Sequence, residues 1–572
     1  MRMPGHAAIA ASVLTLAAIP AFLLAAQPDP VLDAMLAELK RSTTLSLNQL
    51  DKPYFVSYTI DDVHSWTASA TLGALVSSNA TTYRMPSVRV RVGDYQFDNS
   101  NYAGGGAGGA RYDLRSFPLD DDPLVIRQYL WLATDSAYKG SLQTIARKRA
   151  ALRSVTVNDQ LPDFAKVPQF TLVRDYQPVK FDDKAWQDRI RRVSKTFEAF
   201  PALRTSFIEY NVADELHRFV NTEGTEVRLP AATADIQIRA SAQAPDGMIV
   251  RDSAFFYTHD LAKMVPEADL EKAADRVGDT VMKMAAAPLG QAYSGPILFE
   301  GEASPQMLAE VLGRNLHIAR KGVAPPGMPS QAAVTELEGR RGVRIMPEFF
   351  DVVDDPTKPL FGSEEVDDEG VPEKPVSLVE KGVLRDFLRT REPVRGYTES
   401  NGRARLGGSL ATPTNLIVTA HETSSLSDLK QKMIDLCKQR DLAYGIVIRR
   451  MDFPSTAPID EARKILAAAG SGHPVSMPLH VYKLYTDGHE EMIRGVRLRG
   501  LNARSLKDIL AAGDDSVTFN YLENEAPFAL VGYGSSSAEV SVVAPSVLID
   551  DLELTKIDDE LPRLPIAGPP SM

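Results

Sequence analysis

A short stretch near the middle of the chain, SPQMLAEVLGRNLH (residues 304–317), combines an apolar helical pattern with groups that can do chemistry. Glu310 supplies a carboxylate, which can act as a general base towards a water molecule. Arg314 follows four residues later, and His317 lies one turn further on. Side chains four residues apart are neighbours on a helix, so we expect Arg314 to form an ion pair with Glu310. A plain helical ion pair is the preferred interpretation, and a working carboxylate is the alternative.

The elements around this stretch predict an α+β protein. A short apolar strand, GPILFEGEA (residues 295–303), leads directly into the helix that carries Glu310. Before it, residues 27–295 alternate between helical and strand patterns, and after it residues 296–560 are rich in strands. We therefore expect a mixed helix/strand N-terminal and central region, a β-rich C-terminal domain, and a Pro-rich tail at residues 561–572.

Local signals set several of these elements. Asp29 and Pro30 predict the start of a helix, because Asp accepts hydrogen bonds at an N-cap and Pro fits the first turn. In SVRVRV (residues 87–92) the valines should face one side of a strand and the arginines the other. Hairpin turns are expected at NTEG (221–224), EKG (380–382) and TDGHE (486–490). Further helices are expected at residues 124–153, 184–200 and 266–287.

The first 26 residues have the layout of a secretory signal peptide. Arg2 precedes a run of 20 apolar or small residues, and Ala25 and Ala26 come before a polar, Pro-rich start. Cleavage near Ala26 would release the protein into the periplasm or outside the cell. The alternative is an uncleaved membrane anchor, and only then would the chain be attached to a membrane.

The net charge and the single cysteine exclude some functions and structural features. The net charge of −12 argues against non-specific binding of nucleic acid, which needs a basic surface. Cys437 is the single cysteine, so the chain folds without an internal disulfide bond. It lies beside a helical stripe of leucines and Met433, and we expect it to be buried rather than reactive.

From about residue 205 to 556, the order of motifs resembles the TldD/PmbA family, also described as peptidase U62 or modulator of DNA gyrase. The strand before Glu310 comes first, followed by an acidic turn and hairpin in SEEVDDEGVPEKPVSLVEKGVLRDFL (363–388). ESNGRAR (399–405) and LATPTNLIV (410–418) are similar to the family's Asn-Gly-Arg and Thr-Asn signatures. The closing hairpin, helix and strand are similar to HVYKLYTDGHEEMIRGVRLRG (480–500), SLKDILAAGDD (505–515) and VVAPSVLIDDLEL (542–554).

The resemblance implies a zinc site that this sequence has lost. Catalytic members carry His-Glu-x-x-x-His on this helix, and a cysteine near the C-terminus completes the ligand set. Here Ala309 and Arg314 stand at the two histidine positions, while Glu310 keeps the position of the general base. Residues 528–546 contain no cysteine. A methyl group and a guanidinium group cannot bind zinc, and His317, His473, His480 and His489 are not expected to converge on a replacement site.

The resemblance therefore favours a non-catalytic exported subunit. It would bind extended peptide and pair with a TldD-like catalytic subunit, or with a second copy of itself, with zinc held only by the catalytic partner. Two alternatives stay open: an active metallopeptidase with unusual ligands, and a stand-alone protein that binds peptides or assists envelope assembly.

Overall fold

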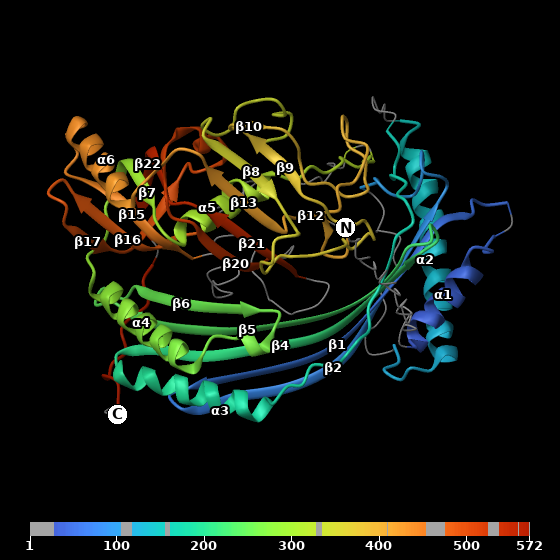
Figure 1. The fold of residues 1–572 in the computed structure, drawn as a ribbon, viewed down its shortest axis with the longest axis horizontal. Helices are drawn as coiled ribbons and strands as arrows, with labels where there is room; N and C mark the ends of the chain where they lie inside the picture. Colours follow the sequence, from blue (N-terminus) through green and yellow to red (C-terminus); the bar gives the residue numbers. More distant parts are fainter. Residues whose placement is uncertain are drawn as a thin grey trace, which may run out of the picture.

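The computed structural model describes residues 28–47, 49–103, 117–154, 161–325, 327, 335–408, 410–452, 475–523, 537–558 and 560–570. The predicted signal peptide and His473 lie outside these ranges. The described chain is an α+β protein, as expected, with one long-stranded N-terminal sheet and two sheets in the C-terminal part. Figure 1 shows the C-terminal part lying over the N-terminal sheet.

The N-terminal part is built on a sheet whose strands run in the order β2-β1-β4-β5-β3, with β6 also paired to β5. Three of the strands have 19 residues each, which corresponds to about 60 Å of extended chain. In Figure 1 they sweep along the lower side of the molecule. The strands are β1 (Pro53–Thr71), β2 (Ala74–Val92), β3 (Thr171–Val173), β4 (Leu203–Asn221), β5 (Glu226–Gln243) and β6 (Ile249–Thr258).

The two faces of this sheet have different roles, because successive side chains of a strand point to opposite faces. Even-numbered residues of β1 and β4 pack against helices: Tyr58 and Ile60 against one helix pair, Ile208 and Tyr210 against another. Fully burying one such large side chain stabilises the fold by roughly 1.5–3 kcal/mol. Odd-numbered residues face the C-terminal part. The helices are α1 (Pro30–Ser42), α2 (Pro123–Ala151), α3 (Asp183–Ser194) and α4 (Glu267–Ala286).

The C-terminal part places one short helix between two sheets. The larger sheet has the order β14-β19-β22-β7-β15-β16-β17 with β18 paired to β22, and the smaller has the order β10-β9-β8-β13-β21-β20. Helix α5 (Ala303–Val311) is buried along its whole length in the core that both sheets share. Helix α6 (Leu426–Gln439) covers the other face of the larger sheet and buries Cys437, as predicted.

The strands of the C-terminal part are β7 (Tyr293–Phe299), β8 (Phe350–Asp354), β9 (Val376–Glu380), β10 (Val383–Leu384), β11 (Ala404–Arg405), β12 (Leu410–Ala411), β13 (Asn415–Ala420), β14 (Thr423–Ser424), β15 (Tyr444–Met451), β16 (Pro478–Tyr485), β17 (Glu490–Ile493), β18 (Val496–Arg499), β19 (Ile509–Gly513), β20 (Val517–Glu523), β21 (Ala538–Ala544) and β22 (Val547–Lys556). β11 and β12 form a separate short hairpin. Short 3₁₀ helices are η1 (Lys195–Ala199), η2 (Leu261–Lys263), η3 (Gly313–Asn315) and η5 (Ala503–Asp508).

Most of the predicted elements are confirmed. Asp29 caps α1 by accepting hydrogen bonds from the backbone N–H groups of Val31 and Leu32. The three expected hairpin turns join β4 to β5, β9 to β10, and β16 to β17. The helix expected over residues 304–317 is wrong in its length, because α5 ends at Val311 and the chain continues as η3. Among the described residues, no helix is long and apolar enough to cross a membrane.

Candidate functional site

The side chain of Glu310 lies in the core of the C-terminal part, at the end of α5. It is only 6% exposed. Its two carboxylate oxygens accept hydrogen bonds from Ser476, one from the backbone N–H at 2.8 Å and one from the hydroxyl at 2.6 Å. Burial raises the pKa of Glu310, and the nearby charge of Arg314 and the hydrogen bonds from Ser476 offset part of that increase. The carboxylate is therefore held in place by Ser476, which sequence reasoning did not find.

The predicted ion pair between Arg314 and Glu310 is wrong. Arg314 lies in η3, after the α-helix has ended, so the four-residue neighbour relation of an α-helix does not apply. Its guanidinium group pairs instead with Glu523 of β20, with a nitrogen–oxygen distance of 3.7 Å. Burial opposes the charge of Arg314, but Glu523 and Glu310 together raise its pKa. Arg314 thus forms an ion pair with Glu523 and also attracts the charge of Glu310 from a greater distance.

The residues at the family's ligand positions do not fit zinc. Ala309 is 1% exposed and packs in the core. Arg314 brings a permanent positive charge to the place where a dication would sit. Repulsion between these charges at about 4 Å costs several kcal/mol even with an effective dielectric constant near 20. No step of a zinc-dependent reaction can be assigned to this helix.

Two of the remaining predicted histidines, His480 and His489, have carboxylate partners other than Glu310. The backbone of His317 pairs with that of Leu388. His480 lies 3.0 Å from Asp252, and His489 bonds Asp487 at 2.6 Å. The imidazoles of His480 and His489 therefore have different carboxylate partners.

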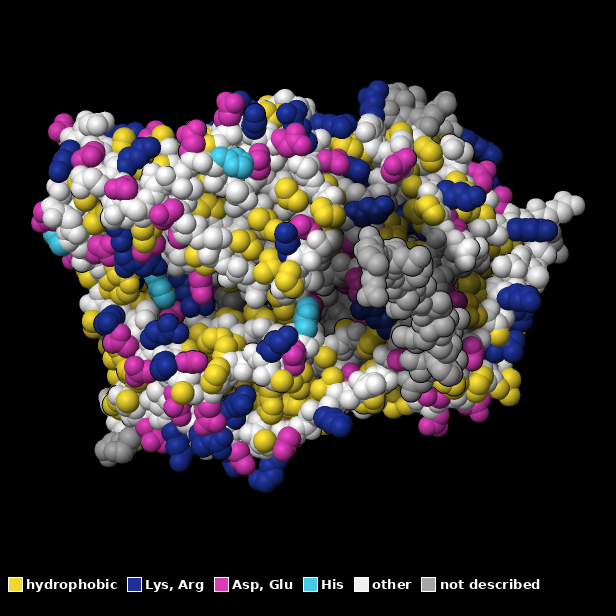
Figure 2. All heavy atoms as spheres, in the orientation of Figure 1, with side chains coloured by type: hydrophobic (Ala, Val, Ile, Leu, Met, Phe, Trp, Pro, Cys, Tyr) yellow, Lys and Arg dark blue, Asp and Glu magenta, His cyan; other side chains and the backbone are white. Residues whose placement is uncertain are grey.

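A large cavity lies between the odd-numbered face of the N-terminal sheet and the C-terminal part. Its volume is about 930 Å³, and Figure 2 shows the surface hollowed between the two layers. β1, β2, β4 and β5 form its floor, while the loop at residues 363–373 and the start of β21 lie across it. No local sequence pattern indicates this cavity, because its walls come from segments far apart in the chain.

Acidic side chains outnumber basic ones in the cavity. Among the described residues, eight carboxylates, four arginines and two histidines line it. The arginines already have acidic partners: Arg405 pairs with Glu364, Arg174 with Glu365, Arg89 with Glu369, and Arg91 with Asp98. The carboxylates that line the cavity are Asp61, Glu215, Glu364, Glu365, Asp368, Glu369, Glu373 and Glu539. A cationic ligand is favoured over an anionic one by this excess of acid.

On the floor of the cavity, Asp61, Glu215 and His217 form a cluster. Asp61 and His217 are directly opposite each other on β1 and β4, and His217 Nδ1 lies 2.6 Å from Asp61 Oδ1. Although burial opposes the imidazolium, Asp61 raises the pKa of His217 to about 9. Burial, and then the charge of Asp61, raise the pKa of Glu215 to about 8. The signal that could have found this cluster is the alternation in ADELHRFV (213–220), which puts Glu215 and His217 on one face.

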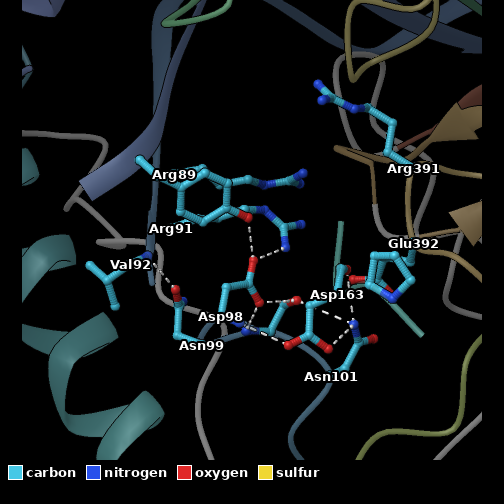
Figure 3. Close-up of polar contacts among 12 residues, drawn as sticks. Arg89, Arg91, Val92, Asp98, Asn99, Asn101, Asp163, Arg391 and Glu392 are labelled. Atoms are coloured by element: carbon cyan, nitrogen blue, oxygen red, sulfur yellow. Dashed lines mark hydrogen bonds and ion pairs between the residues drawn. The ribbon is translucent and has the colours of Figure 1, made fainter. Parts of the chain in front are cut away.

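A second polar network lies at one end of the cavity (Figure 3). Asp98 accepts a hydrogen bond from Arg91 at 3.0 Å and from Tyr54 at 2.6 Å. The ring of Phe164 lies between two guanidinium groups, 3.7 Å from that of Arg91 and 3.9 Å from that of Arg391. Because Asp98 has a cationic partner, this network holds the cavity wall in place and does not offer an open binding site.

Part of the chain is similar in sequence to known metallopeptidases. Residues 293–452 match the model of the PmbA/TldA metallopeptidase C-terminal domain. Two proteins named metalloprotease are similar: one from Archaeoglobus fulgidus is 33% identical over 127 residues, covering 22% of this chain and 30% of the relative. One from Methanothermobacter thermautotrophicus is 26% identical over 199 residues, covering 35% of this chain and 42% of the relative. The matched region thus spans less than half the length of either relative.

Solved structures share the fold over nearly the whole chain. TldE from Thermococcus kodakarensis aligns with a TM-score of 0.59 and 13% identity, covering 91% of this chain and 100% of TldE. A protein from Thermotoga maritima, described as a candidate modulator of DNA gyrase, aligns with a TM-score of 0.57 and 15% identity, covering 92% and 99%. The chain therefore carries a metallopeptidase-type C-terminal domain. Within it, residues 293–452 match the PmbA/TldA metallopeptidase family, and over the rest of the chain the likeness to these structures is one of fold.

Proposed function

We propose that this chain is a non-catalytic TldD/PmbA-family protein that binds peptide and pairs with a zinc-bearing partner. One observation carries the proposal: at the helix positions where the resemblance places two zinc ligands, the chain has a buried methyl group and the guanidinium group of Arg314. Both carboxylate oxygens of Glu310 accept hydrogen bonds from Ser476. The helix has become part of the core.

Two features support peptide binding. The cavity of about 930 Å³ is large enough for several residues of an extended chain, and its acidic lining suits a basic peptide. Strand β2 is an edge strand among the described residues and pairs only with β1. Much of β2 is exposed, so its free edge can accept a peptide by strand addition. Export through the N-terminal segment, followed by pairing outside the cytoplasm, completes the proposal.

The test measures peptidase activity and partner binding together. The mature chain alone is expected to show no peptidase activity, and a pull-down from the native envelope should recover a relative with an intact His-Glu-x-x-x-His motif. Glu310→Gln should leave both results unchanged. Peptidase activity of the pure chain that disappears in Glu310→Gln would refute the proposal.

The second candidate, an active metallopeptidase with unusual ligands, is favoured by one feature only, the cluster of Asp61, Glu215 and His217 in the cavity. This cluster is remote from Glu310, which does not line the cavity. Activity that depends on Glu215 and is independent of Glu310 would support this second candidate over the first.

A further inference from the structure

The side chains of Asp61, Glu215 and His217 are close enough together to bind one metal ion. Asp61 comes from β1, while Glu215 and His217 come from the same face of β4. One ligand atom from each residue lies within 4.8 Å of the other two. Both strands are central in a sheet that helices brace from behind, so the backbone positions are fixed before any ligand arrives.

The two carboxylates of the cluster, Asp61 and Glu215, have few hydrogen bonds or ion pairs to other described residues. Asp61 is 2% exposed, and only its Oδ1 atom takes part in a hydrogen bond. Its other oxygen has no hydrogen bond or ion pair to a described residue, and Asp61 and Glu215 both line the cavity. Glu215 has no hydrogen bond or ion pair to any described residue. A poorly solvated carboxylate without a partner is costly, and either a proton or a cation relieves the cost.

The surrounding charge favours a cation. The arginines of the cavity are bound to other acids, so they do not neutralise this corner. Asp368 adds a further carboxylate close to His217, and burial raises its pKa. Once its donors are deprotonated, the cluster presents two carboxylates and a neutral imidazole, with the Asp368 carboxylate beside them, and this set attracts a dication.

We propose that Asp61, Glu215 and His217 bind one divalent transition-metal ion of the Zn²⁺ or Mn²⁺ class. One imidazole nitrogen and two carboxylates are donors that suit such ions, whereas Mg²⁺ and Ca²⁺ prefer oxygen alone. Ligand atoms about 2.1 Å from one ion lie at most roughly 4.2 Å apart, so only small side-chain movements are needed. Three protein ligands leave a coordination position open towards the cavity.

The metal ion would displace protons from His217 and Glu215. Neutral imidazole and ionised carboxylate are the binding forms, so binding should release protons and strengthen as pH rises. The other charged groups that face the cluster are Asp368 on the loop, Arg89 on β2 and Glu539 on β21. The sequence predicted a chain without zinc, because Ala309 and Arg314 stand at the family's ligand positions. The site proposed here departs from that prediction, since it places an ion on the N-terminal sheet, away from those two positions.

The experiment titrates the metal-stripped mature chain with ZnCl₂ or MnCl₂ by calorimetry in two buffers of different ionisation enthalpy. We expect about one ion per chain, proton release, and affinity at least about tenfold weaker in Glu215→Gln, since ligand removal costs no less than loss of a supporting contact. Co²⁺ absorption gives an independent signature of imidazole ligation, which His217→Asn should abolish. Circular dichroism checks that each variant is folded.

Glu365→Gln is the matched control, because it removes the same charge from the same cavity at a residue outside the cluster. It should change affinity by less than about threefold, as should Glu310→Gln. Absence of binding at millimolar metal would overturn the proposal. So would binding that Glu215→Gln and Glu365→Gln weaken equally, because that result would report only the acidic field.

Discussion

Replacing Arg314 by Met should destabilise the protein far more than replacing Glu310 by Gln. Arg314 is 19% exposed and Glu523 13%, so both charges are largely withdrawn from water. At 3.7 Å, their attraction is about 4 kcal/mol at an effective dielectric constant of 20. Arg314→Met leaves Glu310 and Glu523 without their shared cation, and breaking such a buried pair typically costs about 3–5 kcal/mol.

Glu310→Gln keeps the shape of the side chain. Its carbonyl oxygen can still accept from the N–H of Ser476, and its amide can donate to the hydroxyl, so we expect a loss of about 1 kcal/mol. Arg344→Met is the control for loss of an arginine, because Arg344 is about half exposed in a pair with Glu348 and should contribute less than about 1 kcal/mol.

Urea unfolding followed by circular dichroism measures these three variants, the single variant Glu523→Gln and the double variant Arg314→Met/Glu523→Gln. The double variant should be more stable than the sum of its single effects by at least about 1 kcal/mol. If Arg314→Met costs no more than Arg344→Met, then Arg314 is not the cation that stabilises these buried acids, and the account of the lost zinc position fails with it.

The other predictions concern pH, assembly and processing. Because folding raises the pKa of Glu215 to about 8 and of His217 to about 9, the stability they contribute is present at low pH and lost as pH rises through these values. The melting temperature should fall from pH 6.5 to 9, and this fall should be smaller in Glu215→Gln; an equal fall in both proteins would contradict the assignment. Sedimentation at micromolar concentration should detect a dimer, alone or with a zinc-bearing relative, whose interface exceeds about 1,000 Å², whereas a monomer in both cases argues against pairing. Sequencing of the native protein should begin just after Ala26, and intact Met1 in soluble cytoplasm would exclude export.

Much of the fold was predictable from the sequence, because its signals act within a few residues of one another. The cap at Asp29, the alternation that buries Val88, Val90 and Val92, and the hairpin turn at EKG all depend on local backbone geometry. The absence of histidine at positions 309 and 314 was equally plain in the sequence, since a side chain either can or cannot bind zinc.

The partners of the charged groups were decided only by the tertiary structure. Arg314 is bound to Glu523 rather than to Glu310, because the α-helix ends after Val311 and β20 brings another acid within reach. Asp61 and His217 are 156 residues apart in sequence but directly opposite in the sheet. Pairing of distant strands depends on the register of the whole sheet and on what covers each face. The alternation within each strand can be seen in a single sequence. The register between β1 and β4 depends on packing. That packing brings together the walls of the cavity and the residues of its cluster.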